Sequence, residues 1–164
     1  IAVGFPIPIL LALIINEIRN KAFQKIIQNI TYVPHFLSVV VVVSMLNIFS
    51  DPDYGLFNKF FSLFGIPPTD YMAKPEYFRT LYVFSNVWQN MGFNSIVYIA
   101  ALASIDPTLY EAAVIDGASR LQKIIHVSIP SIISTIIILF IMRIGSLMTV
   151  GFEKVLLMQN PVNS

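Results

Sequence analysis

Cysteine is absent from the 164-residue sequence, which excludes disulfide bonds, thiolate metal sites and cysteine nucleophiles. Charge is scarce as well, since 12% of the residues are charged, whereas an ordinary soluble domain has roughly 25%. Ten basic against nine acidic residues leave a net charge of +1, so no broad basic surface and no nucleic-acid partner are expected. The two histidines, His35 and His126, have no companion ligands at metal-site spacing, so no metal site is expected either.

Apolar residues dominate the composition. They make up 56% of the sequence, and the mean hydropathy is +0.75. Because a helix of about 20 apolar residues spans a bilayer, four segments are predicted to cross a membrane: about 1–16, 26–49, 79–105 and 131–150. The first is short for a span, and we interpret it as a span that lacks its start.

The second predicted span contains the run FLSVVVVVSML, in which the valines favour a β-strand. A single strand would leave its backbone groups unpaired in lipid, so the length of the segment favours a helix. Pro34 predicts that this helix is kinked or starts late. The expected fold class is therefore all-α, a polytopic transmembrane helix bundle.

Polar stretches connect the predicted spans. Residues 50–76 are rich in turn-forming Asp, Pro and Gly, which predicts an ordered extramembrane loop with a short helix at 56–64. Lysine and arginine are concentrated in residues 19–25 beside a membrane end, so this side is predicted to be cytoplasmic, together with 106–130. Both termini are then expected on the outer side, and the tail from 151 is too short and polar to cross again.

The polar stretch 106–130 reads DPTLYEAAVIDGASRLQKIIHVSIP and predicts two short helices. Asp106 can cap the first helix and Pro107 suits its first turn. Gly117 can adopt the left-handed conformation that ends this helix. Ser119 can cap the second helix, which is expected to run towards Pro130 at the membrane edge.

The same stretch resembles the cytoplasmic EAA loop of ABC importer permeases. The sequence Glu-Ala-Ala at 111–113 is followed by Gly117, then by Val127 and by Ile-Pro at 129–130, with the family's spacing. Val127 stands where the family usually has Ile, and Ile129 where it usually has Leu, so both departures stay apolar. The phrases NEIRNKAFQKIIQNITYVPHF and YFRTLYVFSNVWQN further resemble permeases that import oligosaccharides or polysaccharide fragments, in the lipoprotein and polysaccharide transport branch.

This resemblance implies a single permease domain over 1–164, a fragment of a bundle that lacks the N-terminal span and the last one. It implies a bacterial plasma (inner) membrane location, lipid contact and a carbohydrate substrate. The implied partners are cytoplasmic ABC ATPase subunits, a second permease subunit and an extracellular solute-binding protein. In the family the EAA loop docks in a groove of the ATPase, and by position this coupling role carries over to Glu111, Ala112, Ala113, Asp116 and Gly117, with Pro130 closing the loop.

No catalytic residue is assigned. The sequence contains no Walker A loop, GxSxG elbow or HExxH motif, so ATP and Mg are expected on the partner ATPase and no cofactor on this chain. An ATP-independent carrier and a membrane enzyme are weaker alternatives, because the former has no ATPase for an EAA loop to engage and the latter would need a positioned nucleophile or metal. A permease for another solute is a further alternative.

Polar residues inside the predicted spans are the candidates for a substrate path. Asn86, Asn90 and Asn94 recur along one face of the third span, with Gln89 close to the face and Trp88 offset from it. Carboxamides and an aromatic ring suit neutral carbohydrate, while the alternative is interhelical hydrogen bonding.

A charge also lies in the middle of the fourth predicted span. Arg143 in the fourth span could meet an anionic sugar such as a uronate, or it could have a structural partner.

Overall fold

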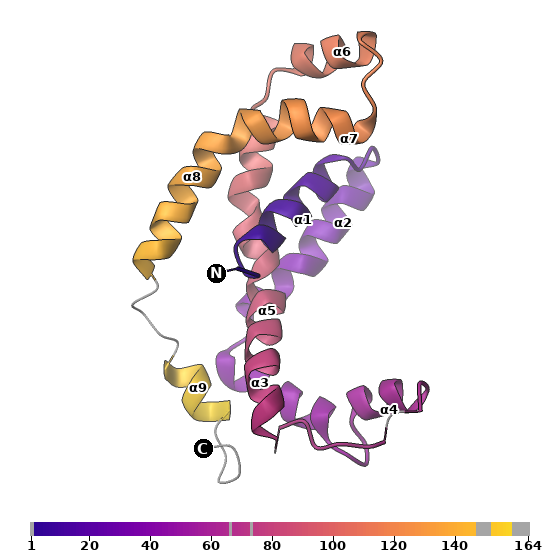
Figure 1. The fold of residues 1–164 in the computed structure, drawn as a ribbon, viewed down its shortest axis with the longest axis vertical. Helices are drawn as coiled ribbons and strands as arrows, with labels where there is room; N and C mark the ends of the chain where they lie inside the picture. Colours follow the sequence, from indigo (N-terminus) through magenta and orange to yellow (C-terminus); the bar gives the residue numbers. More distant parts are fainter. Residues whose placement is uncertain (1, 66, 73, 147–151, 159–164) are drawn as a thin grey trace. The chain divides into compact units, whose positions relative to one another are not determined.

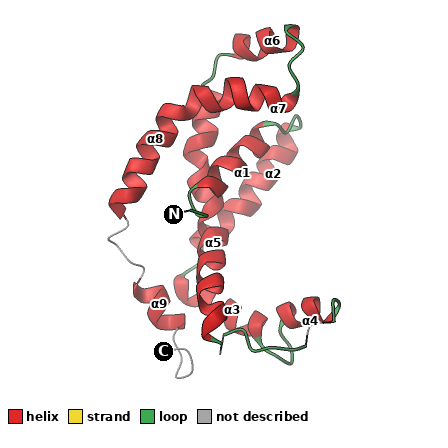
Figure 2. Ribbon diagram, viewed as in Figure 1, coloured by secondary structure: helices red, strands yellow, loops and turns green. Residues whose placement is uncertain are grey.

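Helices make up the regular structure of residues 2–65, 67–72, 74–146 and 152–158, which the computed structural model describes (Figure 1). No strand occurs in these ranges, so the all-α prediction is confirmed (Figure 2). The helical elements are α1 (Pro6–Asn16), α2 (Lys21–Tyr32), η1 (Val33–Phe36), α3 (Val39–Ser50), α4 (Leu56–Ser62), α5 (Pro75–Ala103), α6 (Pro107–Ile115), α7 (Arg120–Lys123), the π-helical η2 (Ile124–Ser128), α8 (Ile129–Gly145) and α9 (Phe152–Met158).

The segment predicted as one helix over 26–49 is two helices. The first of them, α2, already begins at Lys21 and gives way to the 3-10 turn η1, which contains Pro34. Proline lacks the N–H that would continue the α-helical ladder, so the break lies where it was expected. A new helix, α3, then begins after Ser38, whose hydroxyl accepts from the Val41 N–H at 3.3 Å. The valine run is helical, because capping and length outweigh its strand propensity.

The second helix predicted in the 106–130 stretch runs past Pro130 and into the fourth apolar segment. One continuous helix runs from Arg120 to Gly145, so the fourth apolar segment starts well before residue 131. The helix passes through the π-helical turn η2 immediately before Pro130, which lies in the first turn of α8. A wider turn accommodates the proline ring and its missing N–H. Residues 147–150 of the predicted span lie outside the described residues.

By length and composition, Arg120–Gly145 is the one helix in the described ranges that could cross a membrane alone. Two bent pairs pass the same test only if each pair is one span: Lys21–Phe36 with Val39–Ser50, and Glu76–Ala103 with Pro107–Ile115. Helix α1 is apolar but shorter. The assignment of four spans therefore stays a prediction.

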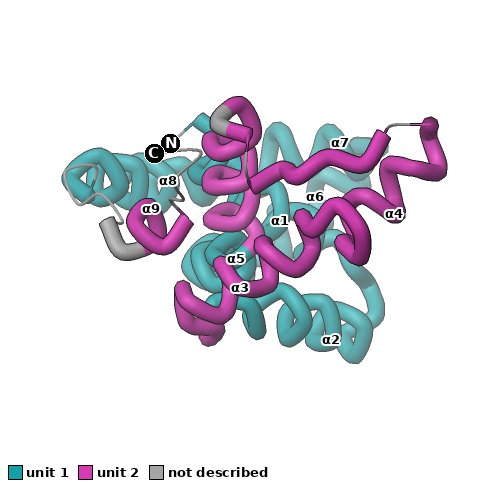
Figure 3. Tube along the Cα trace, turned by 90° about the horizontal axis from the view of Figure 1, so that it is seen from below, with its two compact units in different colours: residues 1–35, 89–149 teal, residues 36–88, 150–164 magenta. Residues whose placement is uncertain are grey.

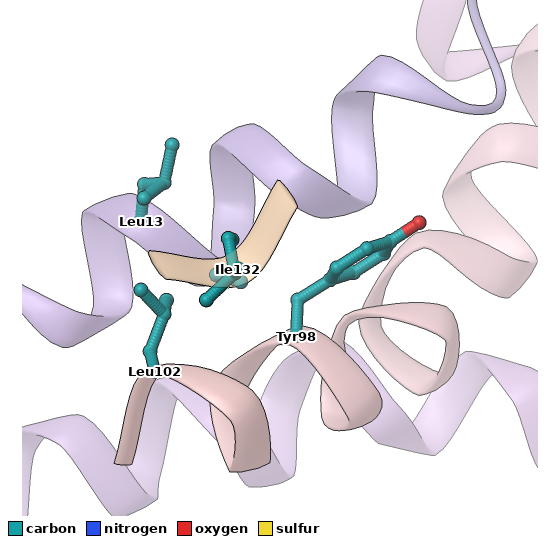
Figure 4. Close-up of a cluster of buried hydrophobic side chains, with 5 residues drawn as sticks. Leu13, Tyr98, Leu102 and Ile132 are labelled. Carbon is teal, nitrogen blue, oxygen red and sulfur yellow. The ribbon is translucent and has the colours of Figure 1, made fainter. Parts of the chain in front are cut away.

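The chain divides into two compact units (Figure 3). Unit 1 comprises 1–35 and 89–149, and α1, the C-terminal part of α5 and α8 meet in its core. Figure 4 shows Ile132 of α8 between Leu13 of α1 and residues Tyr98 and Leu102 of α5. This core fixes α8 against α5, the two helices that carry the candidate path.

Unit 2 comprises 36–88 and 150–164. Its core contains Val43, Leu46, Met72 and Met158. The loop after α3 is held by the buried Asn58 side chain, which donates to the Thr69 carbonyl and accepts from the Thr69 N–H, both at 2.9 Å. The predicted short helix of this loop is present as α4.

A lysine is buried in unit 2. Lys154 of α9 is only 4% exposed, and its Nζ lies 5.7 Å from the centroid of the Tyr82 ring. Within the described part of the chain, this Nζ has no hydrogen-bond partner. Burial disfavours the charged form and lowers the pKa of Lys154 to about 8.

Candidate functional site

The α6 helix begins as its sequence predicts. The Asp106 carboxylate accepts from the Thr108 N–H at 2.9 Å, and Pro107 occupies the first turn. The hydrogen bonds from the Thr108 backbone and side chain hold the pKa of Asp106 below its ordinary value of 3.8. The cap therefore stays ionised at neutral pH, where a negative charge also suits a helix N-terminus.

The end of α6 depends on Gly117, which has a φ of +75°. The Ala118 N–H donates to the Ala113 carbonyl at 2.9 Å. The Gly117 N–H donates to the Val114 carbonyl at 3.0 Å. Together these bonds form a Schellman-type cap, which requires the left-handed conformation at this position. The glycine therefore ends the helix, as predicted.

Helix α6 is fixed to the helix that follows it. It is bent by 71° from α5, and the Tyr110 hydroxyl lies 2.9 Å from the Ser128 hydroxyl in η2. A capping box starts α7, in which the Ser119 N–H donates to the Gln122 side chain at 2.8 Å and the Ser119 hydroxyl accepts from the Gln122 N–H. These contacts join α6 to the start of the long helix Arg120–Gly145.

The tip of α6 presents small and apolar side chains to the outside. Ala112 is exposed, and Val114 and Ile115 are 59% and 85% exposed. Apolar side chains exposed side by side in this way offer a surface on which a partner can dock. Of the other predicted coupling residues, Ala113 is half-buried, whereas Glu111, Asp116 and Gly117 are exposed.

Sequence reasoning missed Val114 and Ile115. The available signal was their position between Ala113 and Gly117 in a helix too short to bury two opposite faces. A groove of about 390 Å³ runs between α6 and the following helix, lined by Ala112, Asp116 and Lys123 among others. Pro130, also predicted for this site, is exposed in the first turn of α8.

The polar residues predicted on α5 differ in how deeply they are buried. Gln89 is buried, Asn86, Trp88 and Asn90 are half-buried, and Asn94 is exposed. The Asn90 Oδ1 lies 3.1 Å from His35 Nδ1 in η1, the kind of interhelical bond that the packing alternative predicts.

Arg143 and Asn94 line the same open pocket in unit 1. Its volume is about 340 Å³, and its other lining residues include Phe93 and Tyr98 of α5 and Phe5 before α1. Over 2–65, 67–72, 74–146 and 152–158 no ion pair to Arg143 is found, and its side chain is exposed. The pocket thus combines aromatic surface, a carboxamide and a cation, which suits an acidic saccharide. Phe93 and Tyr98 were not predicted for the path.

A metal site receives no support from the described residues, which contain no group of three or more His, Cys, Asp and Glu side chains. His35 and His126 contact different elements. His35 faces α5, and His126 Nδ1 lies 3.0 Å from the Gln122 carbonyl of its own helix.

Comparison with known proteins gives strong matches. The polygalacturonan/rhamnogalacturonan transport system permease protein YteP of Bacillus subtilis is 42% identical over 99% of this chain and 51% of its own length. Protein LplB of the same organism is 41% identical over 98% of this chain and 50% of its own length. The chain therefore spans about half the length of these relatives.

A solved structure is also similar. The bacterial ABC transporter involved in the import of the acidic polysaccharide alginate has a chain that matches with a TM-score of 0.93 and 44% identity, covering 99% of this chain and 57% of that one. YteP is a transport permease rather than an enzyme. Residues 4–156 match the family described as binding-protein-dependent transport system inner membrane component. On this evidence the chain belongs to the binding-protein-dependent transport system inner membrane components, as the resemblance in its EAA loop predicted.

Proposed function

We propose that the intact protein is a multi-pass permease subunit of an ATP-driven ABC importer for oligosaccharides or polysaccharide fragments, in a bacterial plasma membrane. The observation that carries the coupling role is the tip of α6, where Ala112, Val114 and Ile115 are exposed on a helix that is capped at both ends. Cytoplasmic ATPase subunits, which bind ATP and Mg, receive this tip in a groove.

Transmission from the ATPase follows from the contacts of α6. When the ATPase subunits close on ATP, they displace α6 as a rigid body. The Tyr110–Ser128 hydrogen bond and the continuous helix Arg120–Gly145 pass this displacement to the pocket that contains Arg143. Access to the path thereby alternates between the two sides of the membrane.

A second permease subunit and an extracellular solute-binding protein complete the transporter. The binding protein is supported by a similar structure, described as an alginate ABC transporter in complex with alginate pentasaccharide-bound periplasmic protein, with a TM-score of 0.93 to this chain. We assign acidic saccharides as the substrate class, because two relatives are named for polygalacturonan and alginate transport and Arg143 places a cation in the pocket.

The coupling role is tested with a crosslink in the full-length transporter. A single cysteine in place of Ala112 is expected to form a disulfide with a cysteine in the ATPase groove, with a yield that changes on adding ATP and substrate. A cysteine at Ser104, which is exposed but precedes α6, is the matched control and is expected not to crosslink. Absence of a crosslink at Ala112 in an inserted, accessible protein would favour the ATP-independent carrier or enzyme alternatives.

The substrate class is tested at Arg143. Arg143→Gln is expected to slow the uptake of a uronate oligosaccharide about tenfold or more, because a charge-assisted hydrogen bond contributes about 1.5–3 kcal/mol. Uptake of the methyl-esterified oligosaccharide should change little. Arg143→Lys should retain part of the preference for the uronate oligosaccharide over its methyl ester. Uptake is measured in proteoliposomes containing the complete transporter. An equal loss for both saccharides would assign Arg143 a structural role instead.

A further inference from the structure

His35 joins two elements that are far apart in the sequence. It lies in η1, directly after the buried Pro34, and its Nδ1 is 3.1 Å from Asn90 Oδ1 on α5. Its ring also stacks on Phe93, with 3.9 Å between the centroids and an interplanar angle of 6°. All of these residues belong to unit 1.

The hydrogen bond defines the orientation of the Asn90 carboxamide. A carboxamide oxygen only accepts, so Nδ1 of His35 must carry the hydrogen in this contact. With Oδ1 directed at His35, the Nδ2 hydrogens of Asn90 lie in the same amide plane and on the other side of Cγ. With Nδ1 protonated, the imidazole holds the Asn90 carboxamide in the orientation that the structure records, in which Oδ1 is the acceptor.

The stacked ring connects the same histidine to the pocket. Phe93 lines the pocket that contains Arg143 and Asn94. Asn90 lies one helical turn before Asn94 on the same face of α5. His35 therefore contacts one residue that lines the pocket and one that continues its polar face, although it is not itself among the lining residues.

We propose that His35 is a positioning residue for carbohydrate transfer, which orients the Asn90 carboxamide and supports the Phe93 ring along the path. Carboxamide donors recognise saccharide hydroxyls only in a fixed orientation, and an aromatic ring binds a sugar face only where its plane is held. This inference rests on the proposed transport function, and it assigns His35 no direct contact with substrate.

Two substitutions separate the hydrogen bond from the ring. His35→Asn places an amide N–H near the position of Nδ1 and so keeps a donor for Asn90 Oδ1, but it removes the stacked ring. His35→Phe keeps an aromatic ring on Phe93 and removes the donor. The assay is uptake at saturating, saccharide-loaded binding protein, in proteoliposomes with equal amounts of the complete transporter.

His35→Phe is expected to lower the transport rate about tenfold, the effect of one lost hydrogen bond that is needed during transfer. His35→Asn is expected to lower the rate less, about threefold, since it restores the donor and lacks only the ring stacked on Phe93. In a double-mutant cycle, His35→Phe should have no further effect once Asn90 is replaced by alanine, because the two side chains act together.

The outcomes distinguish this inference from the function on which it rests. If Asn90→Ala transports every saccharide as the wild type does, the proposed path along α5 fails. If Asn90→Ala is impaired but His35→Phe is not, or if their effects simply add, the path stands and the positioning role of His35 is overturned. If His35→Phe does not assemble, His35→Asn decides alone, because an assembled but inactive His35→Asn transporter contradicts the role of the donor.

Discussion

Replacement of Gly117 by valine is expected to abolish uptake while the protein still inserts into the membrane. The φ of +75° at this position is unfavourable for any residue with a Cβ, and for a β-branched side chain most of all. No atom lies within 4 Å of the Cβ position, so the expected effect comes from the backbone and not from a clash. A strained C-terminus would distort the tip of α6, where Val114 and Ile115 are exposed.

Two matched variants isolate this effect. Gly65 has a similar φ of +76° and equally open space, but it lies in the loop after α4. Gly65→Val therefore introduces the same strain of about 1–2 kcal/mol outside the coupling loop, and ATP-driven uptake should survive it. Gly117→Asn should also retain uptake, because asparagine tolerates the left-handed region. Uptake, ATPase stimulation and the amount of inserted protein are measured together, and normal uptake by inserted Gly117→Val would refute the coupling role of α6.

The second large effect is expected at Gly92, where α2 and α5 cross. A Cβ on Gly92 would overlap the Thr31 carbonyl group, and backbone atoms cannot move aside as a flexible side chain can. Gly92→Ala must therefore push the two helices apart, and we expect destabilisation by about 1–3 kcal/mol or more, as for overpacked cores. The His35–Asn90 hydrogen bond, which bridges the same crossing, should be lost as well.

Thermal unfolding of the purified transporter and the amount of protein in the membrane report this effect. Gly145→Ala is the matched control, because Gly145 ends α8 in open space, with no atom within 4 Å of its Cβ position. Alanine is the better helix former, so this control should be neutral or slightly stabilising. If Gly92→Ala unfolds at the wild-type temperature, the close crossing of α2 and α5 does not exist in the intact protein.

The coupling loop shows why local signals are reliable. Asp106 caps α6, Gly117 ends it and Ser119 caps the next helix, each as the sequence predicts. These contacts join residues only a few positions apart, so their geometry is encoded in adjacent side chains and does not depend on the rest of the fold. The turn around Asn58 in the loop after α3 is harder to predict from the sequence, because its partner Thr69 lies farther along the chain.

Helix boundaries near prolines were predicted less sharply than the helix caps. The second helix of the 106–130 stretch was predicted to run towards Pro130, and through the π-helical turn before this proline it continues as one helix from Arg120 to Gly145. Pro34 was predicted to kink the helix or to delay its start, and the 3-10 turn at Pro34 and the cap at Ser38 separate two helices there. A proline removes one backbone N–H from the hydrogen bonds of a helix. The conformation of the neighbouring turns then determines whether the helix ends there.

The sequence by itself determined the all-α class, the capped ends of α6 and the family, because apolar length, cap chemistry and motif spacing are each encoded in short segments. Only the tertiary structure decided that His35 meets Asn90 and that Arg143 shares a pocket with Asn94. Both pairs come from helices distant in sequence, and they meet because Gly92 admits α2 closely and Ile132 packs on Leu102. Such contacts follow from the packing of whole helix surfaces, which no local pattern of residues specifies.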